Sequence, residues 1–137
     1  MFRLSNKSDY GLILLSSVAR AMEDKSNHFV SISSVAKKNK LSAKFLSQVA
    51  SELKRAGMIS AKEGVAGGYT LAKSAEQIKI LDVLKTLDGE LVRGECFDDD
   101  HECHCGGKDI WMEMKKQMEE TIGSKTVADL VSKDVYR

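Results

Sequence analysis

Apolar residues recur at three- and four-residue intervals along several segments of this chain, which is the pattern of helices that bury one face. The first of these segments predicts a helix over roughly residues 9–23. A second, shorter helix is expected to begin at Ser33. Ser42 can cap a third helix, which should end at Ala56-Gly57 because glycine readily takes the left-handed conformation just beyond a helix.

The spacing of apolar residues changes after the third helix. Residues 58–62 and 69–72 are strand-like, and the glycine-rich segment 64–68 between them predicts a turn. Two helices joined by a tight turn form a helix-turn-helix. A hairpin directly after that unit makes it a winged helix. Gly67 and Gly68 would let the wing backbone approach a phosphate or enter a minor groove.

Two more helices are predicted over residues 80–88 and about 108–123, and a short final helix near residues 126–131. The longer one carries a stripe of large apolar residues: Ile110, Trp111, Met114, Met118 and Ile122. Such a stripe is commonly buried within its own domain. Here it follows the winged helix and lies among acidic segments, so a helix–helix contact between two subunits is favoured.

The expected fold is therefore mainly α with a small β-hairpin wing: a winged helix-turn-helix plus a long dimerisation helix. Residues 1–80 would form the winged helix-turn-helix DNA-binding region. Residues 81–137 would form the cysteine-loop, cluster-binding and dimerisation region.

Charge divides along the same boundary. Residues 1–80 carry 13 Lys and Arg against 6 Asp and Glu, whereas residues 81–137 carry 8 against 14. The positive charge of the first part and the negative charge of the second nearly cancel, which gives a formal net charge of +1. A basic first half suits contact with the phosphates of a nucleic acid, although many solvated surfaces differ in charge without a functional cause.

Composition narrows the class of protein. With 137 residues, of which 42% are hydrophobic and 30% charged, the chain is expected to be globular. It has no apolar run of about 18 residues and no signal-peptide pattern at its start, so we expect a cytoplasmic protein without a membrane partner. No nucleophile, base or cofactor loop is grouped in the way that an enzyme needs, so the chain is not expected to be an enzyme.

All three cysteines of the chain, Cys96, Cys103 and Cys105, fall within ten residues, and His101 and His104 lie in the same segment. Thiolates are soft ligands that suit zinc or an iron–sulfur cluster. Because the chain has no other cysteine, thiols this close together indicate a metal centre. Zinc held by three cysteines and one histidine stays an alternative to a cluster, and a purely thiol-based redox switch is a weaker one.

Helical geometry selects the residues of the third helix that can reach DNA. With Ser42 as the cap, Lys44, Ser47 and Gln48 lie on the exposed face. Lys44 and Gln48 are the candidates for contacts with base edges, and the two serines for contacts with phosphate or base. Phosphate contacts are expected from four further lysines: Lys37, Lys38, Lys40 and Lys62.

Several short motifs extend along the chain. They include Phe2-Arg-Leu-Ser at the start, Asp9-Tyr-Gly-Leu in the first helix and Gly67-Gly-Tyr-Thr-Leu-Ala in the wing. The cysteine segment, Trp111 and residues 126–130 complete the set. Together they resemble the Rrf2 family of bacterial winged-helix regulators over nearly the whole chain. The opening is most similar to the branch that regulates operons for cluster assembly.

The resemblance implies a homodimer in which each subunit presents a recognition helix and a wing to a double-stranded DNA operator. It also implies an Fe–S cluster, 2Fe–2S or 4Fe–4S, held by Cys96, Cys103 and Cys105. One relative takes a fourth ligand from an aspartate near the start of the first helix of the partner subunit, and Asp9 occupies the matching place. Asp9, like Ser8, is at least as well suited to cap that helix.

This chain departs from the family pattern in three respects. Cys103 and Cys105 are separated by a single residue, closer than is usual for the second and third cysteines of the family. The acidic run 98–100 raises the cost of placing a negatively charged cluster nearby. Glu63 stands where the family often has an arginine that reaches the minor groove, so either Lys62 takes that role or the operator differs.

These features together predict a transcriptional regulator that senses redox state, nitric oxide or iron and cluster status through an Fe–S cluster. Its targets would be genes for iron–sulfur assembly or stress. The alternative is a DNA-binding regulator with a structural or sensory zinc site and no cluster. The identity of the metal separates the two hypotheses.

Overall fold

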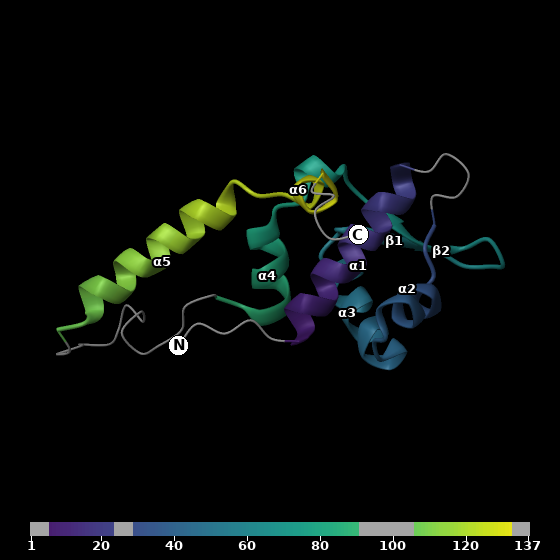
Figure 1. Ribbon diagram of the computed structural model, residues 1–137, viewed down its shortest axis with the longest axis horizontal. Helices are drawn as coiled ribbons and strands as arrows, with labels where there is room; N and C mark the ends of the chain where they lie inside the picture. Colours follow the sequence, from purple (N-terminus) through teal and green to yellow (C-terminus); the bar gives the residue numbers. More distant parts are fainter. Residues whose placement is uncertain (1–5, 24–28, 91–105, 133–137) are drawn as a thin grey trace.

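The computed structural model describes residues 6–23, 29–90 and 106–132. Within these ranges the elements follow one another as α1 (Asn6–Glu23), α2 (Ile32–Asn39), α3 (Ala43–Arg55), β1 (Ile59–Lys62), β2 (Gly68–Leu71), the 3₁₀ helix η1 (Ala75–Gln77), α4 (Ile80–Asp88), α5 (Lys108–Gly123) and α6 (Val127–Ser132). Figure 1 shows α1 to α4 gathered with the hairpin in one body, from which α5 extends. The prediction of a mainly helical chain with one small hairpin is confirmed.

The start of α1 differs from the sequence prediction. Both proposed caps, Ser8 and Asp9, lie inside the helix, which already includes Asn6. Ser8 is fully buried and donates its hydroxyl hydrogen to the carboxylate of Asp88 at the end of α4. The prediction that Ser8 or Asp9 caps α1 is therefore wrong. In the sequence, a serine whose hydroxyl makes a helix–helix contact cannot be told from a serine that caps a helix.

The hydrophobic core lies where α1, α3 and α4 pack against one another. Side chains without exposed surface come from these three helices and from α6: Leu14, Leu15, Val18, Leu46, Val49, Leu53, Val83 and Val127. Burying a side chain of this size stabilises a fold by about 1.5–3 kcal/mol. The inward face predicted for the third helix is confirmed, with Phe45 at its half-buried edge.

The chain after α5 returns to this body. The amide of Ile80 donates to the carbonyl of Lys125 at 3.0 Å, and the amide of Val127 donates to the carbonyl of Ile78 at 2.9 Å. These two bonds join the start of α4 to the start of α6. Val127 enters the core as a result, so the core draws on both halves of the sequence.

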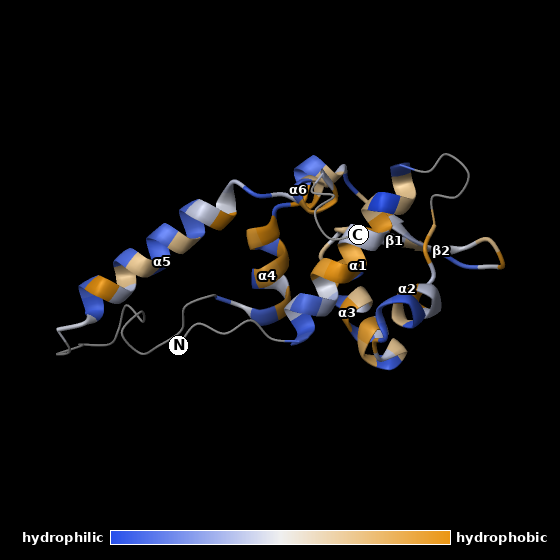
Figure 2. Cartoon of the chain, viewed as in Figure 1, coloured by the Kyte–Doolittle hydropathy of each residue, from blue (hydrophilic) through white to orange (hydrophobic). Residues whose placement is uncertain are grey.

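The apolar stripe of α5 has two parts. Met118 and Ile122, toward its end, are half-buried and pack against the core. Ile110, Trp111 and Met114, toward its start, are 64%, 43% and 44% exposed. Figure 2 shows hydrophobic patches alternating with hydrophilic ones along α5, which stands away from the body. Packing among the described residues of the subunit therefore accounts only for the last turns of the stripe.

A pair of valines tests whether α6 belongs to the folded core. Val127 has no exposed surface, whereas Val65 at the tip of the hairpin is fully exposed. We expect Val127→Ala to lower the free energy of unfolding by about 2 kcal/mol, because two buried methyl groups are lost and a cavity remains. Val65→Ala is the matched control and should leave stability unchanged. Urea denaturation of both variants measures the difference, and equal stabilities would contradict this account of α6.

Candidate nucleic-acid interface

The helix α3 presents one polar face to solvent. The hydroxyl oxygen of Ser42 accepts a hydrogen bond from the amide of Phe45 at 3.2 Å, which makes Ser42 its N-cap as predicted. Lys44, Ser47 and Gln48 are exposed on the first two turns. The opposite side of the helix is the core face, so these three side chains are held outward by the packing behind them. The structure thus places together the side chains that were predicted to read DNA.

A left-handed residue sharpens the turn between α2 and α3. Lys40 has φ of 55° and lies at the end of α2, where the amide of Leu41 donates to the carbonyl of Ala36 at 2.8 Å.

The start of α2 corrects the sequence prediction. Ser31, rather than Ser33, is its N-cap, and its hydroxyl accepts from the amide of Ser34 at 3.2 Å.

The wing is joined to the segment before α2 by an isolated β-bridge. Strands β1 and β2 are antiparallel, with Ile59 opposite Leu71 and Lys62 opposite Gly68. Val30, just before α2, forms a bridge with Tyr69 of β2. Its amide donates to the Tyr69 carbonyl at 2.9 Å and its carbonyl accepts from the Tyr69 amide at 2.8 Å. The wing is therefore tied to the start of α2 by backbone hydrogen bonds.

Backbone geometry requires both wing glycines. A Cβ at Gly67 would collide with the carbonyl of Lys62 across the hairpin. Gly68 has φ of 144°, and a Cβ there would lie 2.6 Å from the carbonyl oxygen of Val30. These constraints explain the glycines without DNA, so a phosphate contact of the wing backbone stays a prediction.

An aromatic ring supports the wing lysine. The Nζ of Lys62 lies 5.4 Å from the centre of the Phe29 ring, within the range of a cation–π interaction. The Lys62 side chain is otherwise exposed, as is the neighbouring Glu63. Because the residue next to it is an acid, Lys62 is the residue that gives the hairpin a positive charge.

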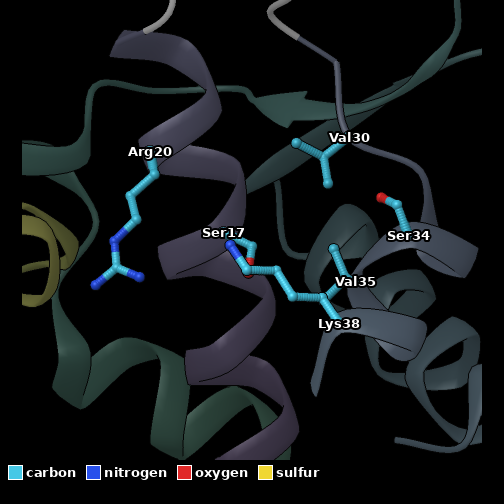
Figure 3. Close-up of a pocket in the computed structure, with 6 residues that line it drawn as sticks. All are labelled: Ser17, Arg20, Val30, Ser34, Val35 and Lys38. Carbon is cyan, nitrogen blue, oxygen red and sulfur yellow. The ribbon is translucent and has the colours of Figure 1, made fainter. Parts of the chain in front are cut away.

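Lys38 takes an unexpected direction. It lines a shallow cavity of about 220 Å³ between α1 and α2, together with Ser17, Arg20, Val30, Ser34 and Val35. Figure 3 shows its side chain lying across this cavity toward Ser17, while Arg20 extends away from the other labelled residues. Lys38 is nevertheless exposed, as are Lys37 and Lys40.

The three predicted cysteine ligands, Cys96, Cys103 and Cys105, lie outside the described residues, as do His101 and His104. Within the described ranges, no group of three or more His, Cys, Asp or Glu side chains is arranged to hold a metal ion. Asp9 is described: it is exposed on the first turns of α1 and makes no hydrogen bond or ion pair with another described residue. Its carboxylate is therefore open to a ligand from outside the described part of the subunit.

Two aromatic residues beside the interface are not indicated by the sequence. Tyr10 of α1 lies against the start of α3, with its ring centroid 4.8 Å from that of Phe45. Phe29 supports Lys62. Both partners are more than thirty positions away in the sequence, so no local pattern pointed to them.

A comparison with protein families decides the classification. Residues 4–133 match the family Rrf2, described as "Iron-dependent Transcriptional regulator". The chain belongs to the Rrf2 family. This match confirms the resemblance found in the sequence motifs. None of the described helices combines the length and apolar character needed to cross a bilayer.

Relatives and solved structures agree with this family. Over 130 residues the chain is 28% identical to the HTH-type transcriptional regulator CymR of Bacillus subtilis, covering 95% of this chain and 90% of that protein. It is 32% identical to protein rrf2 of Nitratidesulfovibrio vulgaris over 133 residues, covering 94% and 87%. The solved structure of B. subtilis CymR, "the Global Cysteine Regulator", aligns with a TM-score of 0.80 and 28% identity over 96% of this chain and 98% of that one. The structure of T. potens IscR aligns with a TM-score of 0.77 and 29% identity over 94% and 85%.

These similarities confirm the winged-helix fold and identify this chain as an Rrf2-family DNA-binding transcriptional regulator. The matched proteins include a cysteine regulator and an IscR. Membership of the Rrf2 family therefore leaves the cofactor of this chain open.

The wing anchor can be tested through Gly68. We expect Gly68→Ala to destabilise the protein by about 1–3 kcal/mol, because the residue would keep a left-handed φ and press its Cβ on the Val30 carbonyl. Amide hydrogen exchange at Val30 and Tyr69 should accelerate. Gly106→Ala, which meets no atom within 4 Å, serves as the control. Unchanged exchange in Gly68→Ala would refute the role assigned to this bridge.

Proposed function

We propose that this chain acts as a homodimer that binds a double-stranded DNA operator, and that a metal centre built on its three cysteines adjusts this binding. The observation that carries the proposal is the polar face of α3, exposed opposite a face with no exposed surface. A helix whose apolar side is buried in the domain can lay its exposed polar side in a major groove.

The residues around α3 divide by the chemistry of their contacts. Lys44 and Gln48 would reach base edges, and Ser42 and Ser47 a base or phosphate. Phosphate contacts would come from Lys37, Lys38, Lys40, Lys62 and the backbone at Gly67 and Gly68. The hydrogen bonds between Val30 and Tyr69 support a common role for wing and α3, because they hold the wing beside the helix-turn-helix.

The apolar start of α5 is the surface for a second copy of the chain. Ile110, Trp111 and Met114 are exposed on a helix that extends from the body, beside the half-buried Met118. An exposed apolar patch of this kind marks an interaction site in a protein that dissolves in water. In a two-fold dimer the same face of both subunits would meet, so one stripe supplies both sides of the contact.

The donor set of the cysteine segment suits a metal centre. The three thiols are soft donors. The exposed carboxylate of Asp9, from this subunit or from its partner, is a hard donor and would bind an iron atom of the cluster weakly. When bound, an Fe–S cluster at Cys96, Cys103 and Cys105 would supply a centre sensitive to oxidants, nitric oxide and iron shortage. A zinc ion with a histidine as fourth ligand is the alternative.

Ion pairs that join α4 and Glu90 to residues 115 and 119 of α5 support a route from the cysteines to the dimer helix. Lys85 of α4 lies 3.5 Å from Glu119 of α5 and 3.8 Å from Glu90. Glu90 also lies 3.8 Å from Lys115 of α5. Because Glu90 immediately precedes segment 91–105, a rearrangement in that segment would act on α5 directly. A coupling of about 1–3 kcal/mol between the two sites would be ordinary for such a regulator.

The base-reading role of α3 is tested with duplexes that wild-type protein selects from a randomised library. Gln48→Ala should weaken binding to the selected duplex by about 1–3 kcal/mol while leaving affinity for unrelated duplexes nearly unchanged. Lys62→Gln should weaken binding to both, and should lower the slope of log affinity against log salt by about 1. Fluorescence anisotropy at several salt concentrations measures all of these.

Lys116→Gln is the matched control, because that lysine is exposed on α5 and is not among the residues proposed to contact DNA. Its affinity and salt slope should equal those of the wild type. If no duplex is selected, or if Gln48→Ala weakens binding to every duplex equally, α3 does not read sequence.

The metal centre is tested by metal and acid-labile sulfide analysis of the full chain purified without oxygen. Iron, sulfide and visible absorption are expected, and Cys103→Ala should remove all three. The affinity for the selected duplex should then change by roughly 5- to 150-fold. Stoichiometric zinc without sulfide would favour the alternative. Protein without any bound metal, or equal affinity in both states, would contradict regulation through the cysteines.

A further inference from the structure

The N-terminal cap of α3 is shared between two helices. In a capping box, the side chain three residues after the cap accepts a hydrogen bond from the backbone amide of the capping residue, and that side chain is Glu or Gln. In α3 the position is Phe45, which has no acceptor. The hydroxyl of Ser42 covers the Phe45 amide, but the Ser42 amide needs an acceptor from elsewhere.

Tyr10 of α1 supplies that acceptor. Its hydroxyl oxygen accepts from the Ser42 amide at 3.4 Å. Its ring meets the Phe45 ring edge-on, with centroids 4.8 Å apart and an angle of 71° between the planes. Both contacts of Tyr10 are made with the first turn of α3. Phe45 occupies the position of the Glu or Gln of a capping box, and Tyr10, which packs against Phe45, supplies the acceptor that this Glu or Gln would provide.

Tyr10 is itself held in place by its neighbours on α1. Lys7 forms an ion pair with Glu52 of α3 at 2.6 Å, and Ser8 donates a hydrogen bond to Asp88 of α4. Three of four consecutive residues at the start of α1 thus contact α3 or α4, and the fourth, Asp9, is exposed. The Tyr10 hydroxyl therefore meets the start of α3 from a fixed position.

We infer that Tyr10 is a positioning residue for DNA reading: its hydroxyl completes the cap of α3 and orients the turn that carries Lys44, Ser47 and Gln48. The inference rests on the proposed function, in which this turn reads the operator. It deepens that proposal by assigning part of the sequence selectivity to α1, a helix without a base contact.

The experiment removes the hydroxyl alone. Tyr10→Phe keeps the ring that packs on Phe45. Tyr69→Phe removes the hydroxyl of another half-buried tyrosine. That hydroxyl makes no hydrogen bond with a described residue, and the bonds of Tyr69 to Val30 are formed by backbone atoms that the substitution keeps. Wild type and both variants are measured for affinity to the library-selected duplex, affinity to an unrelated duplex of equal length, and thermal midpoint. Selectivity is the ratio of the two affinities.

Tyr10→Phe should lower selectivity by about three- to tenfold, the effect of one hydrogen bond. Its affinity for the unrelated duplex should stay unchanged, because the lysines that meet phosphates are not altered. The lost hydrogen bond should lower its thermal midpoint by only a few degrees. Tyr69→Phe should keep wild-type selectivity.

Two outcomes would overturn the inference while leaving the proposed function intact. In the first, Tyr10→Phe retains full selectivity. In the second, both affinities fall together with the thermal midpoint, which would make the hydroxyl a general stabilising group. Wild-type protein that binds all duplexes equally would instead contradict the proposed function itself, and the inference with it.

Discussion

Burial of one face of α3 is the constraint on which the rest of the structure depends. Leu46, Val49 and Leu53 have no exposed surface because α1 and α4 close over them. A helix fixed in this way has only one orientation in which its polar side chains reach solvent. The wing, the turn before α3 and the cap of its first residue all refine the position of a helix that this packing has already oriented.

Periodic apolar spacing was sufficient to predict most elements. The third helix was predicted well because Ser42, its inward residues and Gly57 all indicate the same boundaries, and each signal is local. The hairpin was predictable for the same reason, since its glycines satisfy constraints within the turn and against the neighbouring backbone. The exposed positions of Lys44 and Gln48 follow directly from that helix, although their contacts with bases are not tested by the fold.

The remaining features depend on residues that are distant in the sequence. Ser8 resembled a cap because serine favours that position, but its hydroxyl bonds to Asp88, 80 residues away. Tyr10 and Phe29 were missed because their partners are set by how helices and hairpin pack. The cysteine segment is conspicuous by composition, yet composition cannot fix a ligand geometry.

The bridge between Val30 and Tyr69 also bears on the duplex. Because it ties the wing to the segment that leads into α2, we expect the distance between α3 and the wing to change little when the protein binds DNA. If the protein surface is rigid, the DNA has to deform instead. It must bend or narrow a groove until both α3 and the wing are in contact with it. Sites rich in easily deformed base steps would then bind more tightly than stiff ones that offer the same base edges. Two backbone hydrogen bonds between β2 and the segment before α2 would thus lead to a preference for flexible DNA.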